Sequence, residues 1–395
     1  MESEKVPPPR RVGEILGLQQ QQSLGRDESM YTKEKIASHK LFFDSLAQEL
    51  ALTKQDADIV AVLHILPDSI PLTNALAKIG DINTIVPKPR SVNQQVRAEL
   101  AGVPFCDASK ENILQVVERV SRPTVFLDIG GYFSTIVNEL DHKLGENFRG
   151  IVEDTENGLQ KYEKVGINYP FISVARSPLK ENEDVMVGQA ISFSAEALLR
   201  QHNILVSGLK IGVIGFGKIG RSIAQSMRQK QGSITVHDTD NIRLTHAVST
   251  GLETQTKEKL LSESDAVCLS TGNLSLSGEE FTKLKNGCWV FSVTSSDDEM
   301  NREWLEQNYT RENISDYAVK YTRGNHYFYL LNNGNAINFI HGTTVGDFIL
   351  LVHAEILVAA HRLLTKQQPL DSNELDRSTR DRICKTWLSL FRGIE

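Results

Sequence analysis

The chain is predicted to have an α/β fold of two domains, each built on a parallel β-sheet. Its 395 residues are enough for two hydrophobic cores. Strand-like apolar runs alternate with helical stretches through the first half of the sequence. A glycine-rich turn between an apolar run and a helical stretch then opens a second series of the same kind. This alternation is typical of parallel strands joined by helices that cover both faces of a sheet.

The first series follows a helix that the apolar spacing predicts between Tyr31 and Leu52. IVAVLH, at 59–64, is predicted as a buried strand, and 72–79 as the helix behind it. INTIV, TVFLD and RGIV are predicted as further strands, each with a helical stretch after it. Residues 183–203 are expected to form one long helix that leads into the second domain.

Composition bounds the class of protein. Hydrophobic residues make up 40% and charged residues 24%, as in an ordinary globular protein. The formal net charge of −7 and the lack of a long basic run argue against nucleic acid or an anionic membrane as partner. No long apolar stretch predicts a membrane span or a signal peptide. Four cysteines without CxxC spacing predict a cytoplasmic protein with free thiols and no metal site: Cys106, Cys268, Cys288 and Cys384.

Domain boundaries follow from these patterns. The first 30 residues hold PPPRR, a glutamine run and few large apolar side chains, which predicts a flexible tail. The first domain is expected at 31–188. The second domain is expected at 189–341.

The second domain opens with KIGVIGFGKIGRSIAQSMRQK, an apolar strand followed by a glycine-rich turn and a helix. Gly215 permits the tight turn, and Gly217 lets the backbone approach a pyrophosphate at the helix N-terminus. Gly220 allows the helix to pack closely on the strand. The motif therefore predicts a Rossmann domain that binds a dinucleotide.

A second strand in this domain, SITVHD, ends in Asp238 about 20 residues after the glycine motif. An acidic side chain there suits the ribose 2′-hydroxyl of NAD and repels the 2′-phosphate of NADP. DAVCLSTGN is predicted as a later strand, and Thr271 and Gly272 lie at its carboxyl end, where such sheets hold ligands. NAD is the predicted cofactor; the alternative is a Rossmann-like domain whose cofactor site stays empty.

The stretch from about Val125 to Leu364 resembles adenosylhomocysteinase, the NAD-dependent hydrolase of S-adenosylhomocysteine. The matching pieces, in family order, are FLDIGG, FRGIVEDTENGLQKYEKV, ISVARSPLKENEDVMVGQ, GFGKIGRS, LSTGN, SVTSSDDEMNREWL and NAINFIHGTTVGDF. A weaker match extends back to VAVLHILPDS around His64. The resemblance implies that the NAD-binding Rossmann domain is inserted into a split substrate domain, so that 342–395 completes the domain at 31–188. It also implies a homo-oligomer, either a dimer or a tetramer.

The resemblance also implies a chemistry that begins with redox activation. In this family NAD takes hydride from the 3′ carbon of a ribose, the 5′ substituent is eliminated, water adds, and the ketone is reduced again. A lysine–aspartate pair handles the 3′-hydroxyl, and this sequence keeps it as Lys180 and Asp184. The alternative interpretation is an ordinary surface ion pair at i, i+4 spacing.

Further positions carry over residue by residue. His64 stands where the family has its elimination-step histidine, although a histidine with a structural partner at a strand end is an equal alternative. Asp154 replaces the glutamate of the family's EET segment, and Asp128 ends the strand before it. The catalytic candidates are thus Lys180, Asp184, His64, Asp154 and Asp128. The cofactor-binding candidates are Gly215, Gly217, Lys218, Ile219, Gly220, Asp238, Thr155, Asn157, Thr271, Gly272, Asn273 and Asn338, the last of which faces the nicotinamide carboxamide in the family.

Other family positions are changed. Polar or reactive groups of the family are replaced by Ile129, Val185, Gln189, Ser295 and Val345, and two of the three threonines that contact NAD become Glu156 and Asn157. The C-terminal DRICKTWLSLFRGIE lacks the lysine and tyrosine with which the family reaches a neighbouring subunit's NAD. Ile129 and Val345 cannot transfer protons, so hydrolysis of S-adenosylhomocysteine is expected to be poor. His341 is a candidate replacement acid or base.

Two classes of function follow. The first is an enzyme that acts by redox activation on a hydroxyl of a small nucleoside- or sugar-like substrate, with oxidation, elimination or epimerisation as the net reaction. The second is a catalytically inactive NAD-binding protein with a regulatory or interaction role, which the replaced acid and base positions favour. A 2-hydroxy-acid dehydrogenase shares the Rossmann domain, but the arginine context NxxRG expected of that class is not found.

Overall fold

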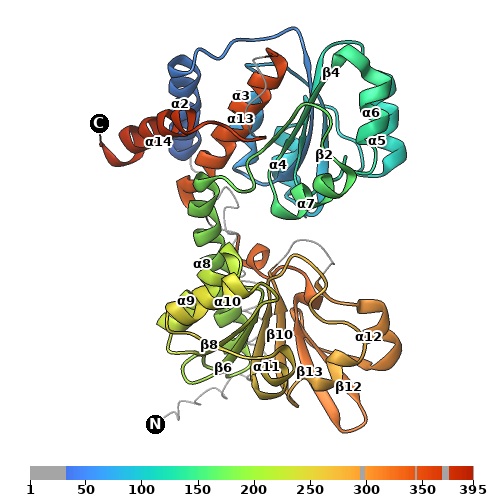
Figure 1. Cartoon of the computed structure of the whole chain (residues 1–395), viewed down its shortest axis with the longest axis vertical. Helices are drawn as coiled ribbons and strands as arrows, with labels where there is room; N and C mark the ends of the chain where they lie inside the picture. Colours follow the sequence, from blue (N-terminus) through green and yellow to red (C-terminus); the bar gives the residue numbers. More distant parts are fainter. Residues whose placement is uncertain (1–32, 294–298, 343–344, 367–372, 395) are drawn as a thin grey trace, which may run out of the picture.

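The computed structural model describes residues 33–293, 299–342, 345–366 and 373–394. They form two α/β units that lie one above the other and are connected by a long helix, α8 (Figure 1). Each unit is built on its own β-sheet. The predicted α/β class is therefore confirmed, while the predicted tail at 1–30 lies outside the described residues.

The upper unit contains a five-stranded sheet in the order β2-β1-β3-β4-β5, with every neighbouring pair parallel. Its central strands are buried on both faces because helices cover both sides, as the uninterrupted apolar runs predict. The strands are β1 (Asp58–Ile65), β2 (Asp81–Val92), β3 (Thr124–Asp128), β4 (Phe148–Glu153) and β5 (Phe171–Ser173). The connecting helices are α3 (Ser69–Leu76), α4 (Gln94–Glu99), α5 (Lys110–Glu118), α6 (Val137–Leu144) and α7 (Glu156–Val165).

The first and the last described helices both belong to the upper unit. The first described helix, α2 (Lys33–Glu49), packs with α13 (Ile349–Leu364) and α14 (Arg377–Arg392), and all three share one hydrophobic core with the sheet. Helix α13 is apolar around almost its whole circumference and is buried along nearly its full length. A helix of that kind belongs in the middle of a core, and here it lies between the sheet and the two outer helices (Figure 1).

The lower unit contains an eight-stranded sheet in the order β11-β12-β13-β10-β9-β6-β7-β8. Five of its strands are parallel in the Rossmann manner: β6 (Lys210–Ile214), β7 (Ser233–His237), β8 (Glu253–Thr254), β9 (Ala266–Leu269) and β10 (Cys288–Ser292). Strand β13 (His326–Leu331) continues the parallel series beside β10, and β12 (Ala318–Arg323) and β11 (Thr310–Ser315) then extend this edge through antiparallel pairs. The sequence analysis did not indicate these three strands. The helices are α9 (Lys218–Gln229), α10 (Asn241–Ser249), α11 (Lys257–Glu263) and α12 (Arg302–Asn308).

The connecting helix α8 spans Pro178–Gln201, so it begins ahead of the predicted start at Glu183. Ser177 caps it by accepting a hydrogen bond from the backbone N–H of Leu179, and proline occupies the first helical position. Both features are standard helix-start signals. The earlier start places Lys180 and Asp184 on the first turns of a regular helix.

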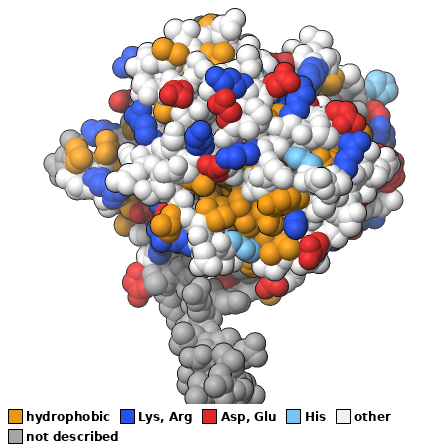
Figure 2. All heavy atoms as spheres, turned by 90° about the horizontal axis from the view of Figure 1, so that it is seen from below, with side chains coloured by type: hydrophobic (Ala, Val, Ile, Leu, Met, Phe, Trp, Pro, Cys, Tyr) orange, Lys and Arg blue, Asp and Glu red, His pale blue; other side chains and the backbone are white. Residues whose placement is uncertain are grey.

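The surface at the lower end of the molecule carries a group of hydrophobic side chains among intermixed basic and acidic ones (Figure 2). Intermixed charges of this kind do not make the continuous basic surface that is typical of nucleic-acid binding. Among the described residues, no helix is both long and apolar enough to cross a membrane.

Candidate functional site

A cavity of about 1350 Å³ lies between the two units. Residues at the carboxyl ends of the strands of both sheets line it, including His64 and Asp154 from the upper unit and Gly215, Asp238 and Ser270 from the lower one. Ligands of open α/β sheets bind at these ends. The cavity exceeds the roughly 300–1,000 Å³ of a typical small-ligand site, so it has room for a dinucleotide and a second small molecule.

The glycine-rich turn after β6 has the geometry that each glycine was predicted to permit. Gly215 has a φ of +95°, which favours glycine. A Cβ on Gly220 would lie 2.0 Å from the carbonyl oxygen of Gly215, so no side chain fits between helix α9 and the turn. A Cβ on Gly217 would meet only Arg243, at 3.9 Å, which leaves open space in front of the α9 N-terminus. Ile219, the next predicted residue, also lines the cavity. The turn therefore fits a pyrophosphate.

Asp238, at the end of β7, is buried and held in a fixed orientation. Its two carboxylate oxygens accept hydrogen bonds from the backbone N–H of Phe216, at 2.6 Å, and of Asp240, at 2.8 Å. The guanidinium of Arg243 lies 3.6 Å from the same carboxylate. Because Asp238 lines the cavity directly beside the glycine turn, it is placed to accept ribose hydroxyls.

The loop after β9 carries Thr271, Gly272 and Asn273, all of which line the cavity. Glu299 fixes this loop from behind, because its carboxylate accepts hydrogen bonds from the Gly272 N–H, at 2.6 Å, and the Thr271 hydroxyl, at 2.8 Å. Burial raises the pKa of Glu299, although these hydrogen-bond donors act to lower it. Glu299 was not predicted as a site residue, although it lies within the matching segment SVTSSDDEM.

Asn338 has a buried polar atom that a bound ligand could pair with. Its side-chain oxygen is buried and finds no hydrogen-bond partner in the described part of the chain, and the residue lines the cavity. A buried acceptor without a donor is costly, so native proteins rarely leave one unpaired. The amide N–H of a nicotinamide carboxamide is a donor of the required kind. This acceptor, the open glycine turn and Asp238 together fit NAD.

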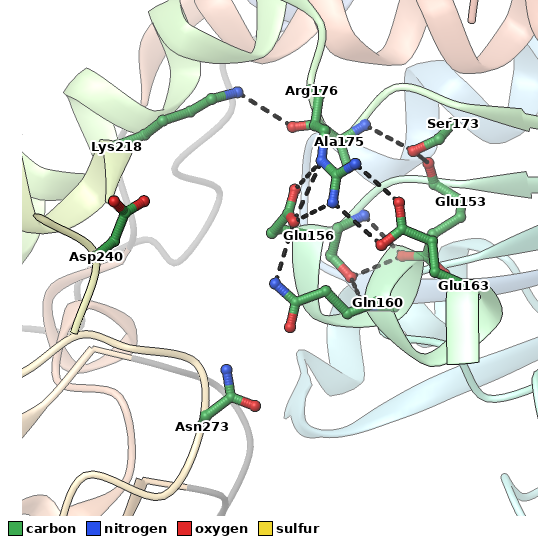
Figure 3. Close-up of polar contacts among 12 residues, drawn as sticks. Glu153, Glu156, Gln160, Glu163, Ser173, Ala175, Arg176, Lys218, Asp240 and Asn273 are labelled. Carbon is green, nitrogen blue, oxygen red and sulfur yellow. Dashed lines mark hydrogen bonds and ion pairs between the residues drawn. The ribbon is translucent and has the colours of Figure 1, made fainter. Parts of the chain in front are cut away.

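The segment after β4 holds Thr155, Glu156 and Asn157, which also line the cavity. The Thr155 hydroxyl donates to Glu153, at 2.7 Å, and caps helix α7 by accepting from the Gly158 N–H. Glu156 forms an ion pair with Arg176, at 2.7 Å, so its carboxylate is turned toward the upper unit (Figure 3). The Thr155 hydroxyl and the Glu156 carboxylate are therefore engaged within the protein.

Lys218, the first residue of α9, was predicted to contact the cofactor. Its ammonium instead reaches the upper unit, where it donates to the carbonyl oxygen of Ala175 at 3.1 Å (Figure 3) and lies 3.8 Å from Asp184. Lys218 lines the cavity, but its charge is directed at the start of α8 and away from the glycine turn.

Lys180 and Asp184 are both buried and both line the cavity. The Lys180 ammonium does not pair directly with Asp184; it donates to Asp154, at 3.0 Å, and to Glu183, at 2.7 Å. Burial alone would lower the pKa of Lys180, but the three surrounding carboxylates outweigh it and raise that pKa. The structure therefore does not match a surface ion pair, and the lysine stays protonated.

Glu183 is the site residue that the sequence did not reveal. Its carboxylate lines the cavity with a side chain only 13% exposed, and it accepts from Lys180 at i, i+3 spacing. Burial raises the pKa of Glu183 to about 7, with Lys180 opposing and Asp154 adding to the effect. Only the structure shows that α8 already covers Lys180, which brings the two residues onto one face of the helix.

His64, at the end of β1, faces the same cavity from the opposite side. Its Nδ1 is hydrogen-bonded to the Ser91 hydroxyl at 2.6 Å, and its ring contacts that of Phe339. Burial lowers the pKa of His64 well below its ordinary value, and the charges of Lys88 and Lys180 lower it further. The imidazole is therefore neutral and can accept a proton.

Asp128 is not part of the cavity lining. Its carboxylate accepts hydrogen bonds from the N–H groups of Tyr132 and Phe133, at 3.1 and 2.9 Å, and from the Tyr162 hydroxyl. Burial raises the pKa of Asp128 against these donors. Asp128, which was predicted as a catalytic residue, therefore holds the turn after β3.

The replaced positions fall into two groups. Ile129 and Val345 line the cavity, so both apolar replacements lie where a substrate would bind. Val185 and Gln189 are exposed on the outer side of α8, outside the lining. His341 also lies outside it and pairs with the Ser194 hydroxyl, at 3.1 Å, so it is not placed to act as acid or base. Ser295 lies outside the described residues.

Known proteins are similar to this chain over much of its length. The family model for the NAD-binding domain of S-adenosyl-L-homocysteine hydrolase matches residues 191–344. The adenosylhomocysteinase of Aeropyrum pernix is 26% identical over 297 residues, which cover 71% of each chain. That of Thermotoga maritima is 25% identical over 284 residues, which cover 68% of this chain and 69% of the relative. That of Saccharolobus solfataricus is 27% identical over 299 residues and 71% of each chain.

Solved structures are more distant. A dipicolinate synthase from Bacillus halodurans aligns with a TM-score of 0.42 and 13% identity, over 65% of this chain and 88% of that one. A phosphoglycerate oxidoreductase from Vibrio cholerae aligns with a TM-score of 0.41 and 16% identity, over 64% and 79%. The sequence relatives are the more informative comparison: residues 191–344 match the NAD-binding domain of S-adenosyl-L-homocysteine hydrolase, the chain is similar to an adenosylhomocysteinase over 71% of its length, and its cofactor is NAD.

Proposed function

We propose that this protein is an enzyme that uses NAD to oxidise a hydroxyl of a small nucleoside- or sugar-like substrate. The observation that carries the proposal is the Lys180 ammonium, which is buried in the cavity and held between Asp154 and Glu183. A buried cation at a fixed position can bind a substrate hydroxyl and stabilise negative charge that develops on its oxygen.

The residues around the cavity divide into a group that would bind NAD and a group that would bind the substrate. Asn338 and the glycine turn hold the nicotinamide and the pyrophosphate, and Asp238 holds the adenosine ribose. NAD, when bound, supplies a hydride acceptor. Lys180, Asp184 and Asp154 then orient the substrate hydroxyl. Their burial excludes water, which strengthens the electrostatic interactions among them.

The reaction after oxidation depends on which proton carriers remain. His64 is neutral and faces the cavity, so it is available as a base for a hydrogen that the new ketone has acidified. Ile129 and Val345 supply no proton transfer where the family has polar groups. We therefore propose simple oxidation, elimination or epimerisation as the net reaction, with S-adenosylhomocysteine hydrolysed poorly.

The second candidate is an inactive NAD-binding protein with a regulatory or interaction role. The apolar Ile129 and Val345 in the lining favour it. The buried charges of Lys180, Asp154 and Glu183 favour an enzyme, because a protein without catalysis has no need to keep them in a cavity at the expense of desolvation.

The test uses the purified full chain loaded with NAD and mixed with adenosine, inosine, S-adenosylhomocysteine and a panel of sugars. Reduction of bound NAD is followed by absorbance and fluorescence, and the ketone product is identified by mass spectrometry. NADH formation with any of these compounds supports the proposal. If none of them reduces bound NAD, the inactive-protein candidate replaces it.

We also propose a cytoplasmic homo-oligomer, a dimer or a tetramer, on the strength of the family relationship. Light scattering of the purified full chain at several concentrations tests the assembly, and a monomer at all of them would contradict it.

A further inference from the structure

The cluster around Lys180 contains more carboxylates than ion-pair partners. Asp154 pairs with Lys180, at 3.0 Å, and Asp184 faces Lys218, at 3.8 Å. Glu183 also binds Lys180, at 2.7 Å, so this lysine serves two carboxylates. Among these five groups, three carboxylates share two lysines, which leaves one negative charge in excess. Lys88 on β2 lines the same cavity, and its charge also acts on Asp154.

Lys180 itself cannot accept the proton that oxidation releases. Its ammonium is already protonated and donates to Asp154 and Glu183, and the carboxylates around it raise its pKa. An ammonium in that state donates hydrogen bonds and does not remove a proton from an alcohol. The proton acceptor for the hydroxyl must therefore be another group in the cavity.

We propose that Glu183 is the proton acceptor in the oxidation step, an inference that rests on the proposed function. Its carboxylate lines the cavity, and within the described residues Lys180 is its hydrogen-bond partner through Oε2, which leaves Oε1 for a substrate hydroxyl. Asp154 keeps the ammonium in place after Glu183 is protonated, and Asp184 remains opposite Lys218. Protonation of Glu183 removes the excess charge of the cluster.

The step balances as follows. The carbon–hydrogen bond of the substrate breaks and its electron pair leaves with the hydrogen to NAD. The hydroxyl proton passes to Oε1 of Glu183, and the carbon–oxygen single bond becomes a carbonyl. The positive charge of the oxidised cofactor and the negative charge of Glu183 disappear together, so the buried site becomes less charged.

The surroundings of Glu183 set its titration. Lys180 and Asp184 lie on its own helix, and Asp154 faces it from the end of β4. Lys218 on α9, His64 on β1 and His353 on α13 line the same cavity. Burial lowers the pKa of both histidines, so they are neutral near pH 7 and add no charge. Burial raises the pKa of Glu183 to about 7, which suits a group that takes up and releases a proton at neutral pH.

The experiment compares the wild-type protein with Glu183→Gln, which keeps the shape but cannot accept a proton. Glu181→Gln is the matched control, since Glu181 lies on the same helix but is exposed and outside the cavity lining. NADH formation is measured in single turnovers with adenosine, inosine and S-adenosylhomocysteine between pH 5 and 9, and NAD affinity is measured by calorimetry. Infrared difference spectra follow carboxyl protonation without any substrate.

We expect the wild-type rate to rise with pH and to level off above about 7, and Glu183→Gln to be about 100- to 10,000-fold slower with NAD affinity unchanged. A carboxyl band that titrates near neutral pH is expected in the wild type and in Glu181→Gln but not in Glu183→Gln. If Glu183→Gln reacts as fast as the wild type, or if both show the same carboxyl band, Glu183 is not the proton acceptor. The proposed function would still stand in that case. Failure of the wild type to form NADH overturns the proposed function, and the assignment with it.

Discussion

The ammonium of Lys218 lies 3.8 Å from the carboxylate of Asp184 and donates to the carbonyl oxygen of Ala175. Lys218 belongs to the first turn of helix α9, which follows the glycine-rich turn, whereas Ala175 precedes α8 in the upper unit. One side chain thus connects the cofactor side of the cavity to the helix that carries Lys180.

Lys218→Ala should therefore loosen the contact between the two units. Loss of one hydrogen bond and a partly exposed ion pair corresponds to about 1 kcal/mol, or roughly fivefold in an equilibrium. We expect a larger radius of gyration by small-angle X-ray scattering and a several-fold slower formation of NADH. Lys259→Ala, which removes an exposed pair with Glu263, is the control. Unchanged scattering and rate would show that the contact has no role in holding the units together.

Asp238→Ser should weaken NAD binding and reduce the difference between the affinities for NAD and NADP. The variant loses the carboxylate that is placed to accept ribose hydroxyls, but it keeps Arg243 beside the site. Loss of a charged hydrogen bond of about 1.5–3 kcal/mol corresponds to roughly 10- to 150-fold in NAD affinity. Calorimetry with both cofactors measures the change. Equal binding of NAD and NADP by the wild-type protein would contradict this role of Asp238.

Local sequence features were enough to predict the geometry of the glycine-rich turn in the candidate site. The requirements at Gly215 and Gly220 arise within one strand–turn–helix segment, and Asp238 follows in the next strand. Such requirements are visible in the sequence because the interacting residues are close along the chain. The strands β11–β13 at the edge of the same sheet were missed, although Gly324-Asn325 separates β12 from β13 as a two-residue hairpin signal.

The catalytic half could be predicted only in part. The i, i+4 spacing pointed to Asp184 as the partner of Lys180, whereas the ammonium binds Asp154 from β4 and Glu183 from its own helix. The first of these contacts spans 26 residues, and the second depends on where α8 begins. Asp128 shows the same limit, since a carboxylate at a strand end can turn to the backbone of its own loop instead of the cavity.

Hydrolysis of S-adenosylhomocysteine should be slower than about one turnover per second, the low end of ordinary enzymes. The reason is that Ile129 and Val345, which line the cavity, cannot transfer protons. The double variant Ile129→Asp, Val345→His should hydrolyse it faster, whereas Val185→Asp, an exposed control, should not. Homocysteine release is the measurement. Wild-type turnover at or above about one per second would contradict the prediction.

Lys180→Ala should reduce NADH formation by about 100- to 10,000-fold and leave the affinity for NAD nearly unchanged. The substitution removes the cation that binds the substrate hydroxyl but touches none of the groups assigned to NAD. Lys180→Arg keeps the charge and should retain more activity than Lys180→Ala. Stopped-flow fluorescence gives the rate, and circular dichroism checks that both variants fold. Equal rates in the wild type and Lys180→Ala would remove Lys180 from the site.

The raised pKa of Glu183 also predicts how the free energy of unfolding depends on pH. In the unfolded chain this carboxyl loses its proton near its ordinary pKa of 4.5, but in the folded protein it does so at about 7. Between these values the folded state binds more protons than the unfolded state, so its stability falls as pH rises. The loss is complete above about pH 7 and amounts to a few kcal/mol at most, at about 1.4 kcal/mol per pKa unit.

Glu183→Gln should lack this contribution, because glutamine does not titrate. The difference in unfolding free energy between Glu183→Gln and the wild type, measured by urea denaturation, should therefore move in favour of the variant as pH rises from about 4.5 to 7 and stay constant above that. Glu181→Gln should follow the wild-type curve, since Glu181 is exposed. A difference that is independent of pH would mean that Glu183 titrates near its ordinary value and that burial does not hold its proton.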